Sequence, residues 1–558
     1  MRRSYGLSMA ESHEDHRPQM FPRLSAAQLG RLESLGHRRR VQQGEIIVEQ
    51  GAVSPDFYVV LSGGVAIVQP AEREERRLAM LVEGQFTGEL NIVSGRANLL
   101  RIRALTDGEL LAITPEGLRR IVQSDADLSE VLIRAFLLRR AALISEGGGS
   151  AILVGSTHSA PTMRAREFLS RNGQPHTYID VDRDPDVQAL LDKFALRVDE
   201  VPILICRGDR VLKNPSNEEI ADCLGFNREL NPAAVRDVVV VGAGPAGLAA
   251  AVYGASEGLD VLVLEGSAPG GQAGSSSRIE NYLGFPTGVS GEVLTARAYT
   301  QAQKFGAEFV IAHPAMRLQC QRRPYSVELS NGTSVKTRAM VIATGVQYRK
   351  PDSAAFGRFE GVGVYYAATP MEAQLCRGED LVIVGGGNSA GQAAVFLASY
   401  ARSVQVLVRG AGLAAMMSRY LINRIEGTPN VTVRAYQQVV GGEGGDHLER
   451  VQVRDGRLGE TRTLPVRHVF MMTGADPNTV WLQGCVAMDE KGFVKTGNDL
   501  RPPDLGAWPL ARPPYALETS APGVFAVGDV RAGSVKRVAS AVGEGSACIQ
   551  LVHRVLSE

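Results

Sequence analysis

A glycine-rich turn between an apolar strand and an alanine-rich helix has the clearest chemistry in the sequence. The strand at 238–241 runs into Gly242-Ala243-Gly244-Pro245-Ala246-Gly247, and a second strand, at 261–264, ends at Glu265, 23 residues after Gly242. The glycines let the backbone approach a pyrophosphate, the helix N-terminus stabilises its charge, and the acid accepts a ribose hydroxyl. Because strand, turn, helix and acid are all present, the pattern predicts a dinucleotide site rather than a purely structural turn.

A second glycine turn follows the same plan further along the chain. The strand at 381–384 runs into Gly385-Gly386-Gly387-Asn388-Ser389-Ala390, and the next strand, at 404–408, ends in Arg409, 24 residues after Gly385. An acid at that position would favour NAD, whereas an arginine can pair with a 2′-phosphate. The turn therefore predicts a second dinucleotide site that prefers NADPH to NADH, and Arg419 either assists or is merely solvated.

The composition is that of an ordinary globular chain with several domains. At about 150 residues per domain, 558 residues give a prior of three to four domains. Sixty basic and sixty acidic side chains cancel, so no bulk charge favours nucleic acid or a membrane as a partner. The first 21 residues lack the apolar segment of a secretory signal, and the glycine turn accounts for the uncharged run 238–256. The expected compartment is the cytoplasm.

The cysteines are too few and too scattered for a disulfide scaffold or a local zinc site. No two of them form a C-x-x-C pair, so the sequence predicts neither a local dithiol nor a metal site. The six are Cys206, Cys223, Cys320, Cys376, Cys485 and Cys548.

The elements that position these residues begin with a small β-roll. Glycines separate short strands, and a helix at 128–143 follows them and ends at a glycine–serine linker, 147–150. The run Arg38-Arg39-Arg40 is expected to be a solvated turn. The strands are expected at 45–50, 57–61, 65–69, 78–82 and 99–104.

The next block alternates strands and helices. The pattern predicts strands and helices in the order β-α-β-α-β-β-α. The expected ranges are 151–155, 160–171, 176–181, 184–196, 201–206, 210–212 and 218–224. From residue 235 onward, longer α/β segments with the two glycine turns indicate two nucleotide-binding lobes.

Residues 237–557 resemble the low-molecular-weight thioredoxin reductase family of FAD-dependent pyridine nucleotide oxidoreductases. The resemblance implies FAD and NADPH as cofactors and a homodimer. It also implies an FAD-binding lobe split between 236–349 and 475–558, with an NADPH-binding lobe, 350–474, inserted into it. Besides both glycine turns, it rests on Gly270-Gly271-Gln272, Ile279–Pro286, Val341–Gly345, Gly523–Asp529 and Arg537-Val538-Ala539.

The resemblance also implies which residues contact each cofactor, with Asp529 on the ribitol of FAD. For FAD it implies Gly242, Gly244, Pro245, Ala246, Gly247, Glu265, Gly271, Gln272, Asn281, Ala343, Thr344, Gly345, Gly528, Asp529, Arg537, Val538 and Ala539. For NADPH it implies Gly385, Gly387, Asn388, Ser389, Ala390 and Arg409.

The chain departs from that family at its catalytic C-A-T-C segment. Ala367-Ala368-Thr369-Pro370 stands there, so Ala367 and Pro370 occupy both cysteine positions. Neither residue can form a thiolate or a mixed disulfide. We therefore assign no catalytic residue and expect no disulfide reduction by an internal dithiol. Cys376 is either a lone reactive thiol or, as we expect, a buried small side chain.

Residues 151–226 resemble a glutaredoxin or thioredoxin-like domain. Val201-Pro202 stands where such domains have a cis-proline, and Ser159-Ala160-Pro161-Thr162 lies in the register of their C-P-Y-C motif. Both cysteines of that motif are absent. The resemblance therefore implies the groove of the domain without its redox chemistry, and Cys206 is expected to be packed.

Residues 20–146 resemble a cyclic-nucleotide-binding β-roll. The phosphate-binding cassette would begin at Gly88-Glu89-Leu90, with Glu89 on the ribose 2′-hydroxyl, but the phosphate-binding arginine position falls on Asn98. Arg96 would reach the phosphate only if the loop changed register. We expect a docking domain that has lost its ligand, with cyclic-nucleotide binding through Gly88, Glu89, Leu90 and Arg96 as the alternative.

The predicted fold is multidomain: a β-roll, a thioredoxin-like α/β domain and two Rossmann-like three-layer nucleotide-binding lobes. The predicted function is NADPH-dependent oxidoreduction through FAD, which the β-roll could regulate. The acceptor is unidentified: a protein disulfide, a quinone, an iron or iron–sulfur centre, or oxygen. The alternative is a redox-inactive flavin sensor or binding module.

Overall fold

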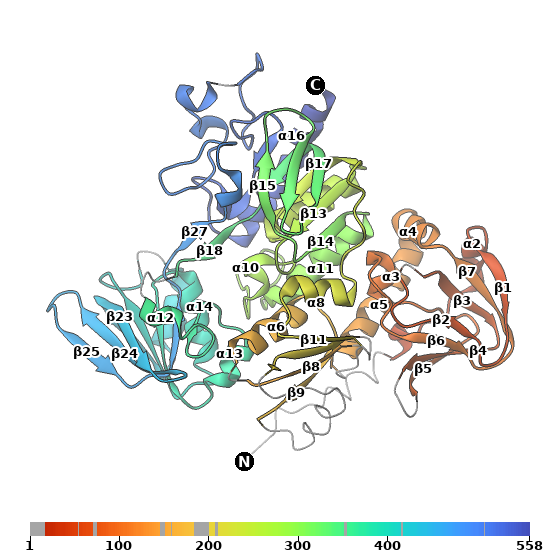
Figure 1. The fold of residues 1–558 in the computed structure, drawn as a ribbon, viewed down its shortest axis with the longest axis horizontal. Helices are drawn as coiled ribbons and strands as arrows, with labels where there is room; N and C mark the ends of the chain where they lie inside the picture. Colours follow the sequence, from red (N-terminus) through yellow and green to blue (C-terminus); the bar gives the residue numbers. More distant parts are fainter. Residues whose placement is uncertain are drawn as a thin grey trace.

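The computed structural model describes residues 17–558 apart from 54, 71–74, 146–150, 158, 183–199, 207–209, 351–353, 415–416 and 507. The expected linker 147–150 and helix 184–196 lie outside these residues. Figure 1 shows four parts, and each is named here by its residues. They are the roll (20–146), the middle domain (151–226), the central lobe (236–349 and 475–558) and the inserted lobe (350–474).

The roll contains two antiparallel sheets, ordered β1-β7-β3 and β2-β6-β4-β5. Three aromatic rings, Phe57, Phe86 and Phe136, meet in its core, where Phe136 presents its edge to the other two. The strands are β1 (His37–Val41), β2 (Ile46–Val48), β3 (Phe57–Ser62), β4 (Gly64–Gln69), β5 (Arg76–Val82), β6 (Arg101–Ala104) and β7 (Gly108–Ile113). The helices are α2 (Ala26–Glu33), α3 (Leu90–Ser94), α4 (Pro115–Ser124) and α5 (Ala126–Ser145).

The expectation of a solvated turn at Arg38-Arg39-Arg40 is wrong. These residues lie in β1, which pairs antiparallel with β7. Arg38 pairs with Glu109 of β7 at 3.0 Å, and Arg39 pairs with Glu45, the residue before β2, at 2.7 Å. Exposed arginines are compatible with a strand because its side chains alternate between two faces.

The middle domain is a four-stranded sheet, ordered β11-β10-β8-β9, with α6 and α8 packed on it. The peptide bond Val201–Pro202 is cis, as the sequence predicts. Phe168 and Phe226 stack in a core that includes Ile311 and Ala312 of the central lobe, so the two parts share one hydrophobic core. The elements are β8 (Ala151–Gly155), α6 (Ala160–Arg171), β9 (His176–Asp180), β10 (Ile203–Cys206), β11 (Arg210–Lys213) and α8 (Asn217–Leu224).

The central lobe is built on one sheet to which both of its sequence halves contribute. Its strands follow the order β14-β13-β12-β17-β16-β15, and β28 pairs with β17. The strands are β12 (Val235–Val241), β13 (Val261–Glu265), β14 (Glu308–Ile311), β15 (Ala315–Gln319), β16 (Tyr325–Leu329), β17 (Ser334–Ile342) and β28 (Val524–Ala526). The helices are α9 (Pro245–Ser256), α10 (Gly271–Gly274), α11 (Gly291–Lys304) and α16 (Val538–Ser557), and a 3-10 turn covers Gly528–Val530.

The inserted lobe, like the central lobe, contains a sheet of parallel strands, and two short strands join it to the central lobe. Its five-stranded sheet, β19-β26-β20-β21-β22, lies beside a three-stranded sheet, β23-β24-β25, and β18 (Val346–Tyr348) pairs with β27 (Ala475–Pro477) at the crossing. The strands are β19 (Val364–Tyr365), β20 (Asp380–Val384), β21 (Ser403–Val408), β22 (Val431–Ala435), β23 (Gln437–Gly444), β24 (Leu448–Asp455), β25 (Thr461–Leu464) and β26 (His468–Met471). The helices are α12 (Ala354–Gly357), α13 (Pro370–Leu375), α14 (Asn388–Leu397) and α15 (Arg419–Glu426).

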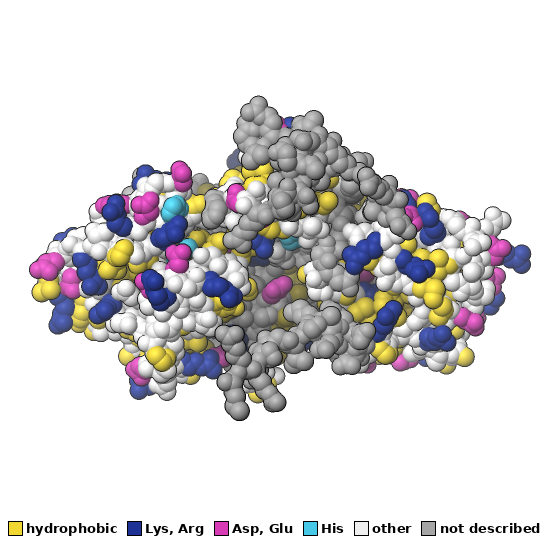
Figure 2. Space-filling model, turned by 90° about the horizontal axis from the view of Figure 1, so that it is seen from below, with side chains coloured by type: hydrophobic (Ala, Val, Ile, Leu, Met, Phe, Trp, Pro, Cys, Tyr) yellow, Lys and Arg dark blue, Asp and Glu magenta, His cyan; other side chains and the backbone are white. Residues whose placement is uncertain are grey.

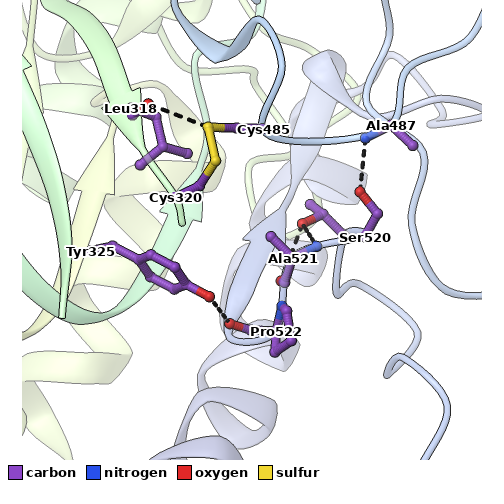
Figure 3. The surroundings of a disulfide bond; sticks show 9 residues. Leu318, Cys320, Tyr325, Cys485, Ala487, Ser520, Ala521 and Pro522 are labelled. Atoms are coloured by element: carbon purple, nitrogen blue, oxygen red, sulfur yellow. Dashed lines mark hydrogen bonds between the residues drawn. A yellow bond between two sulfur atoms is a disulfide. The ribbon is translucent and has the colours of Figure 1, made fainter. Parts of the chain in front are cut away.

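Four of the six cysteines form disulfides, which the scattered spacing did not predict. Cys320 and Cys485 join the two sequence halves of the central lobe across 165 residues, close to the Tyr325 hydroxyl that donates to the Pro522 carbonyl (Figure 3). Cys206 is packed, as expected, but it is also bonded to Cys223 within the middle domain. Spacing along the chain carries no information on such pairs because folding brings them together.

The surface carries charges of both signs. In Figure 2, basic and acidic side chains are interspersed on both ends of the visible face, as expected for a net charge of zero. Within the described residues, no helix has both the length and the apolarity needed to cross a membrane.

Candidate functional site

A cavity of about 1050 Å³ lies where the central lobe, the inserted lobe and the middle domain meet. It gathers residues that are up to about 380 positions apart in sequence, because the parallel sheets of both lobes point the ends of their strands towards it and the middle domain packs beside them. The predicted residues that line it are Gly242, Gly244, Pro245, Ala246, Glu265, Gly271, Gln272, Asn281, Ala343, Thr344, Gly345, Ala367, Asn388, Ser389, Asp529, Arg537 and Val538.

The first glycine turn has the backbone geometry that the sequence predicts. A Cβ atom at Gly242, where φ is +102°, would lie 2.4 Å from the Ala343 carbonyl oxygen, and one at Gly247 would lie 1.8 Å from the Gly242 oxygen. At Gly244 the nearest atom would be 3.9 Å away, so this side of the turn is open. Gly244 is the N-cap residue of α9 and has no side chain to satisfy the amides of the first turn. These amides therefore suit an anion such as a pyrophosphate.

Glu265 lies at the end of β13 and is held by the backbone. One carboxylate oxygen accepts from the Ala243 amide at 2.8 Å, and the other accepts from the Ser267 amide at 2.9 Å. Burial raises the pKa of Glu265, and these amide hydrogen bonds oppose the rise. Each carboxylate oxygen has a further lone pair, so Glu265 can still accept from a hydroxyl group in the cavity.

Asp529 lies on the opposite side of the turn, in the 3-10 segment Gly528–Val530. Burial raises its pKa, and the Lys536 ammonium opposes that rise. Lys536 itself donates to the Asp529 carbonyl oxygen and to the Ser534 hydroxyl. The Gly528 amide donates to Glu544 at 2.7 Å, which fixes this segment on α16. The carboxyl group of Asp529 is thus presented to the cavity by a rigid support.

The second glycine turn reaches the same cavity at the N-terminus of α14. Gly387 is the N-cap residue of this helix, and a Cβ atom there would meet nothing within 4 Å. Asn388 and Ser389 line the cavity, and the Asn388 side-chain oxygen accepts from the Ser418 amide at 2.7 Å. The arrangement again leaves room for a phosphate at a helix N-terminus.

Some predicted residues do not line this cavity. Gly247 and Gly385 allow close backbone approach behind their turns rather than facing the cavity. Arg409, at the end of β21, is exposed, as is Arg419 at the start of α15. The predicted residues outside the cavity lining are Gly247, Gly385, Gly387, Ala390, Arg409, Gly528, Ala539, Pro370 and Cys376.

Sequence reasoning missed that the middle domain forms one wall of this cavity. The lining includes residues of α6, whose N-terminus carries the segment in the C-P-Y-C register. Arg171 of this helix donates to the Gly271 carbonyl oxygen at 3.0 Å, and a Cβ atom at Gly361 would lie 3.3 Å from that of Ala160. The α6 residues in the lining are Ala160, Pro161, Met163, Arg164, Glu167 and Arg171. No local sequence signal specifies how separate domains dock.

The segment Ala367–Pro370, which is expected at the position of a C-A-T-C motif, begins at the same cavity. Ala367 lines the cavity, while Pro370 occupies the first turn of α13 behind the N-cap residue Thr369. Cys376, at the C-terminal end of α13, is fully buried, and burial raises its pKa to about 11. A buried thiol with a raised pKa is a poor nucleophile, which agrees with the expectation of a packed side chain.

The cassette of the roll is divided between two places. Gly88 and Glu89 line a cavity of about 240 Å³, but Arg96 does not. One Glu89 oxygen accepts from Arg140 at 3.2 Å, and its other oxygen has no partner among the described residues. Burial raises the pKa of Glu89. Leu90 is half-buried on the core of the roll.

The assignment of Arg96 to a cyclic-nucleotide site is wrong for this structure. Its guanidinium carbon lies 4.4 Å from the ring centre of Phe226, which follows the last helix of the middle domain. It also donates to the Asn172 carbonyl oxygen at 3.3 Å. Aromatic and carbonyl partners outside the roll hold Arg96 because a guanidinium stacks well on a ring face.

Comparison with known proteins gives the family. Residues 236–545 match the family described as pyridine nucleotide-disulphide oxidoreductase, which is more than half of the chain. The chain belongs to the pyridine nucleotide-disulphide oxidoreductase family. In this pyridine nucleotide-disulphide oxidoreductase, residues 38–125 also match the cyclic nucleotide-binding domain, so the N-terminal part is a fused module.

Thioredoxin reductases are among the proteins to which the chain is similar. The chain is 30% identical over 328 residues to thioredoxin reductase of Listeria innocua and 31% identical over 324 residues to that of Streptomyces clavuligerus. These matches cover 58% of this chain and 95% and 94% of those proteins. The crystal structure of T. acidophilum thioredoxin reductase is similar with a TM-score of 0.52 and 26% identity, over 58% of this chain and 99% of that one. Thioredoxin reductases use FAD and NADPH.

Proposed function

We propose that this chain is an NADPH-dependent FAD oxidoreductase that passes electrons to an acceptor without an internal dithiol. One observation carries the proposal: the first glycine turn, the N-terminus of α14 and Asp529 all open onto one cavity. Two dinucleotides held at these places would share one enclosed space, which an electron transfer between them requires.

FAD is assigned to the central lobe because the residues there fit its groups. Amides at the start of α9 would hold the pyrophosphate, Glu265 would accept from a ribose hydroxyl, and Asp529 would contact the ribitol. Gly242 and Gly247 keep the turn narrow enough for this approach. The remaining assigned residues are Gly244, Pro245, Ala246, Gly271, Gln272, Asn281, Ala343, Thr344, Gly345, Gly528, Arg537, Val538 and Ala539.

NADPH is assigned to the inserted lobe, with Arg409 on the 2′-phosphate. Exposure of Arg409 suits this role, because a long cationic side chain can reach a phosphate from the surface. We expect Arg409→Gln to raise KM for NADPH by roughly two- to fivefold, the range of an exposed ion pair, and to leave KM for NADH unchanged. Steady-state kinetics with both coenzymes measures this, and Arg454→Gln, at an exposed arginine of β24 outside the cavity lining, is the matched control. Equal effects on both coenzymes would remove the assignment.

The chain itself restricts the acceptor. When bound, NADPH and FAD supply hydride transfer, which needs no acid or base from the protein. Ala367 and Pro370 cannot relay the electrons, so the acceptor must be reduced at the flavin. A folded partner would have to displace α6, which belongs to a core shared with the central lobe. We therefore propose a small acceptor, such as a quinone, rather than a protein disulfide.

The test is an anaerobic titration of the purified, FAD-loaded protein with NADPH, followed by a panel of acceptors. We expect the flavin absorbance band to bleach within seconds and to return on adding a quinone. Catalytic turnover with a protein disulfide, together with no turnover with a quinone, would refute only the proposal that the acceptor is a small molecule. Absence of bleaching would refute the enzyme itself.

A second candidate function is a redox-inactive flavin sensor. It is favoured by the loss of functional residues in three parts that keep their scaffolds: Asn98 in the roll, Ser159 and Thr162 in the middle domain, and Ala367 with Pro370. This reading expects tight FAD binding and negligible turnover with every acceptor of the panel, so the same titration separates the two functions.

A further inference from the structure

A second cavity, of about 340 Å³, lies between the roll and the central lobe. One wall comes from α3 and α4 of the roll, and the other comes from α11 and β14, which Figure 1 shows next to α3. It has no lining residue in common with the large cavity described above. The two cavities are therefore separate sites.

This second cavity is rich in arginine. Four arginines line it, Arg96, Arg119, Arg120 and Arg228, against two carboxylates, Glu116 and Glu308. Glu308 is already paired with Arg236 at 2.7 Å. The cavity thus has an excess of positive charge that its own acidic residues do not balance.

Arg96 is the most buried of these cations, at 6% exposed. It is held by ring faces, with its guanidinium carbon 4.4 Å from the Phe226 ring centre and 5.6 Å from that of Tyr299. Its Nη1 donates to a backbone carbonyl, but Nε and Nη2 have no partner among the described residues. Buried charged donors without acceptors are costly, so these two atoms call for an anionic acceptor in the cavity.

Arg228 is placed in the cavity wall by a glycine of the roll. A Cβ atom at Gly95 would lie 1.5 Å from the Arg228 Nη2, so only glycine lets this side chain lie across the end of α3. Its Nε is also buried without a partner among the described residues. Burial lowers the pKa of Arg228, and the nearby Arg119 lowers it further. Arg228 and Arg119, from the two sides of the domain boundary, are therefore held close together, and Glu308, which already pairs with Arg236, is the acidic residue that acts on Arg228.

We propose that this cavity binds a small phosphate-bearing molecule. Guanidinium groups bind phosphate oxygens through paired, charge-assisted hydrogen bonds, and four of them around one cavity match a dianion. Because Arg96, Arg119 and Arg120 belong to the roll and Arg228 follows the middle domain, the bound phosphate joins the roll to the rest of the chain.

The experiment measures thermal unfolding of the FAD-loaded full-length protein in inorganic phosphate or pyrophosphate, with sodium chloride at equal ionic strength as the reference. A ligand that binds only the folded protein raises Tm in a saturable manner. The double variant Arg119→Gln/Arg120→Gln, whose side chains are half-buried and exposed, tests the site without disturbing the core. We expect it to weaken the apparent affinity for pyrophosphate at least tenfold. The matched control is Arg134→Gln, an exposed arginine of α5 outside the cavity.

The outcomes separate this site from the other places where phosphate could bind. Arg409→Gln must leave the shift unchanged, because that residue belongs to the inserted lobe, and an effect there would overturn the proposal. The proposal would also be overturned if pyrophosphate raised Tm no more than sodium chloride does, or if the rise in Tm persisted in the double variant. Cyclic AMP, a phosphate monoanion, is tested beside inorganic phosphate to decide whether the cavity prefers a nucleotide or a free phosphate. If either molecule binds to the wild type and not to the double variant, the proposed site is supported.

Discussion

The glycine turn of the central lobe opens into a cavity of about 1050 Å³, whereas the cassette of the roll lines a cavity of only about 240 Å³, and an arginine of the roll already binds its glutamate. Both contain a glutamate whose pKa is raised by burial. Glu265 is satisfied by backbone amides at 2.8 and 2.9 Å, which leave it facing the cavity. One Glu89 oxygen accepts from the Arg140 side chain, and Arg96 packs against rings outside the roll rather than lining the cassette cavity. A short motif is therefore a binding site only where the surrounding fold leaves its polar groups available.

The largest expected effect comes from closing the turn of the central lobe. In Gly242→Ala, the new Cβ atom would lie 2.4 Å from a backbone oxygen that cannot move away, and its φ of +102° is unfavourable for alanine. We expect at least a tenfold loss of bound FAD, measured as the ratio of flavin to protein absorbance after gel filtration. Gly30→Ala in α2, which meets nothing within 4 Å, is the control. Full FAD retention in Gly242→Ala would show that the turn is not the binding element.

The second-largest effect is expected from the disulfide of the central lobe. The described residues of the roll contain no such bond. Removing the bond between Cys320 and Cys485, which closes a loop across 165 residues, should destabilise the protein by about 2–4 kcal/mol. Urea unfolding followed by flavin fluorescence of Cys320→Ser/Cys485→Ser measures this. Wild-type protein in reductant should lose at least this amount, because reductant also breaks the bond between Cys206 and Cys223, and a change below about 0.5 kcal/mol in the double variant would contradict the prediction.

Cys376 is a buried thiol that lines neither the large cavity nor the cavity of the roll. Burial favours its neutral thiol and raises its pKa to about 11 from 9, so its thiolate is about 100-fold scarcer near pH 8 than that of an ordinary thiol. Alkylation of the native protein, followed by peptide mass spectrometry, should speed up about tenfold per pH unit between pH 7.5 and 9.5. A rate that levels off near pH 9 would indicate an accessible, ordinary thiol. Cys376→Ser should retain full NADPH-dependent activity.

The smallest expected effect tests the cassette directly. Because Arg140 already donates to Glu89, we expect Glu89→Gln to leave any heat from cyclic AMP or cyclic GMP at millimolar concentration unchanged in calorimetric titration. Binding that disappears in Glu89→Gln would reverse this conclusion, and it would mean that the free Glu89 oxygen is sufficient to capture a ribose hydroxyl.

Much of the fold could be predicted because its signals are local. The strand, turn and helix around Gly242 depend on residues within about 25 positions of each other, and the middle-domain helix 160–171 has the predicted bounds. The strand at 37–41 could not be recognised, since Arg38–Arg40 are stabilised as a strand only by pairing with residues about 70 positions later. The wall formed by α6 depends on domain docking, for which no local pattern exists.

The sequence by itself determined the two glycine turns, the acid that follows the first and the arginine that follows the second, and the absence of thiols at 159, 162, 367 and 370. These features concern backbone freedom and chemical type, which belong to each residue and its neighbours. Only the tertiary structure decided that Arg96 points away from the cassette, that Cys320 meets Cys485, and that α6 encloses the large cavity. Those outcomes depend on packing between distant segments, where the burial of apolar surface selects one arrangement among many that the local sequence permits.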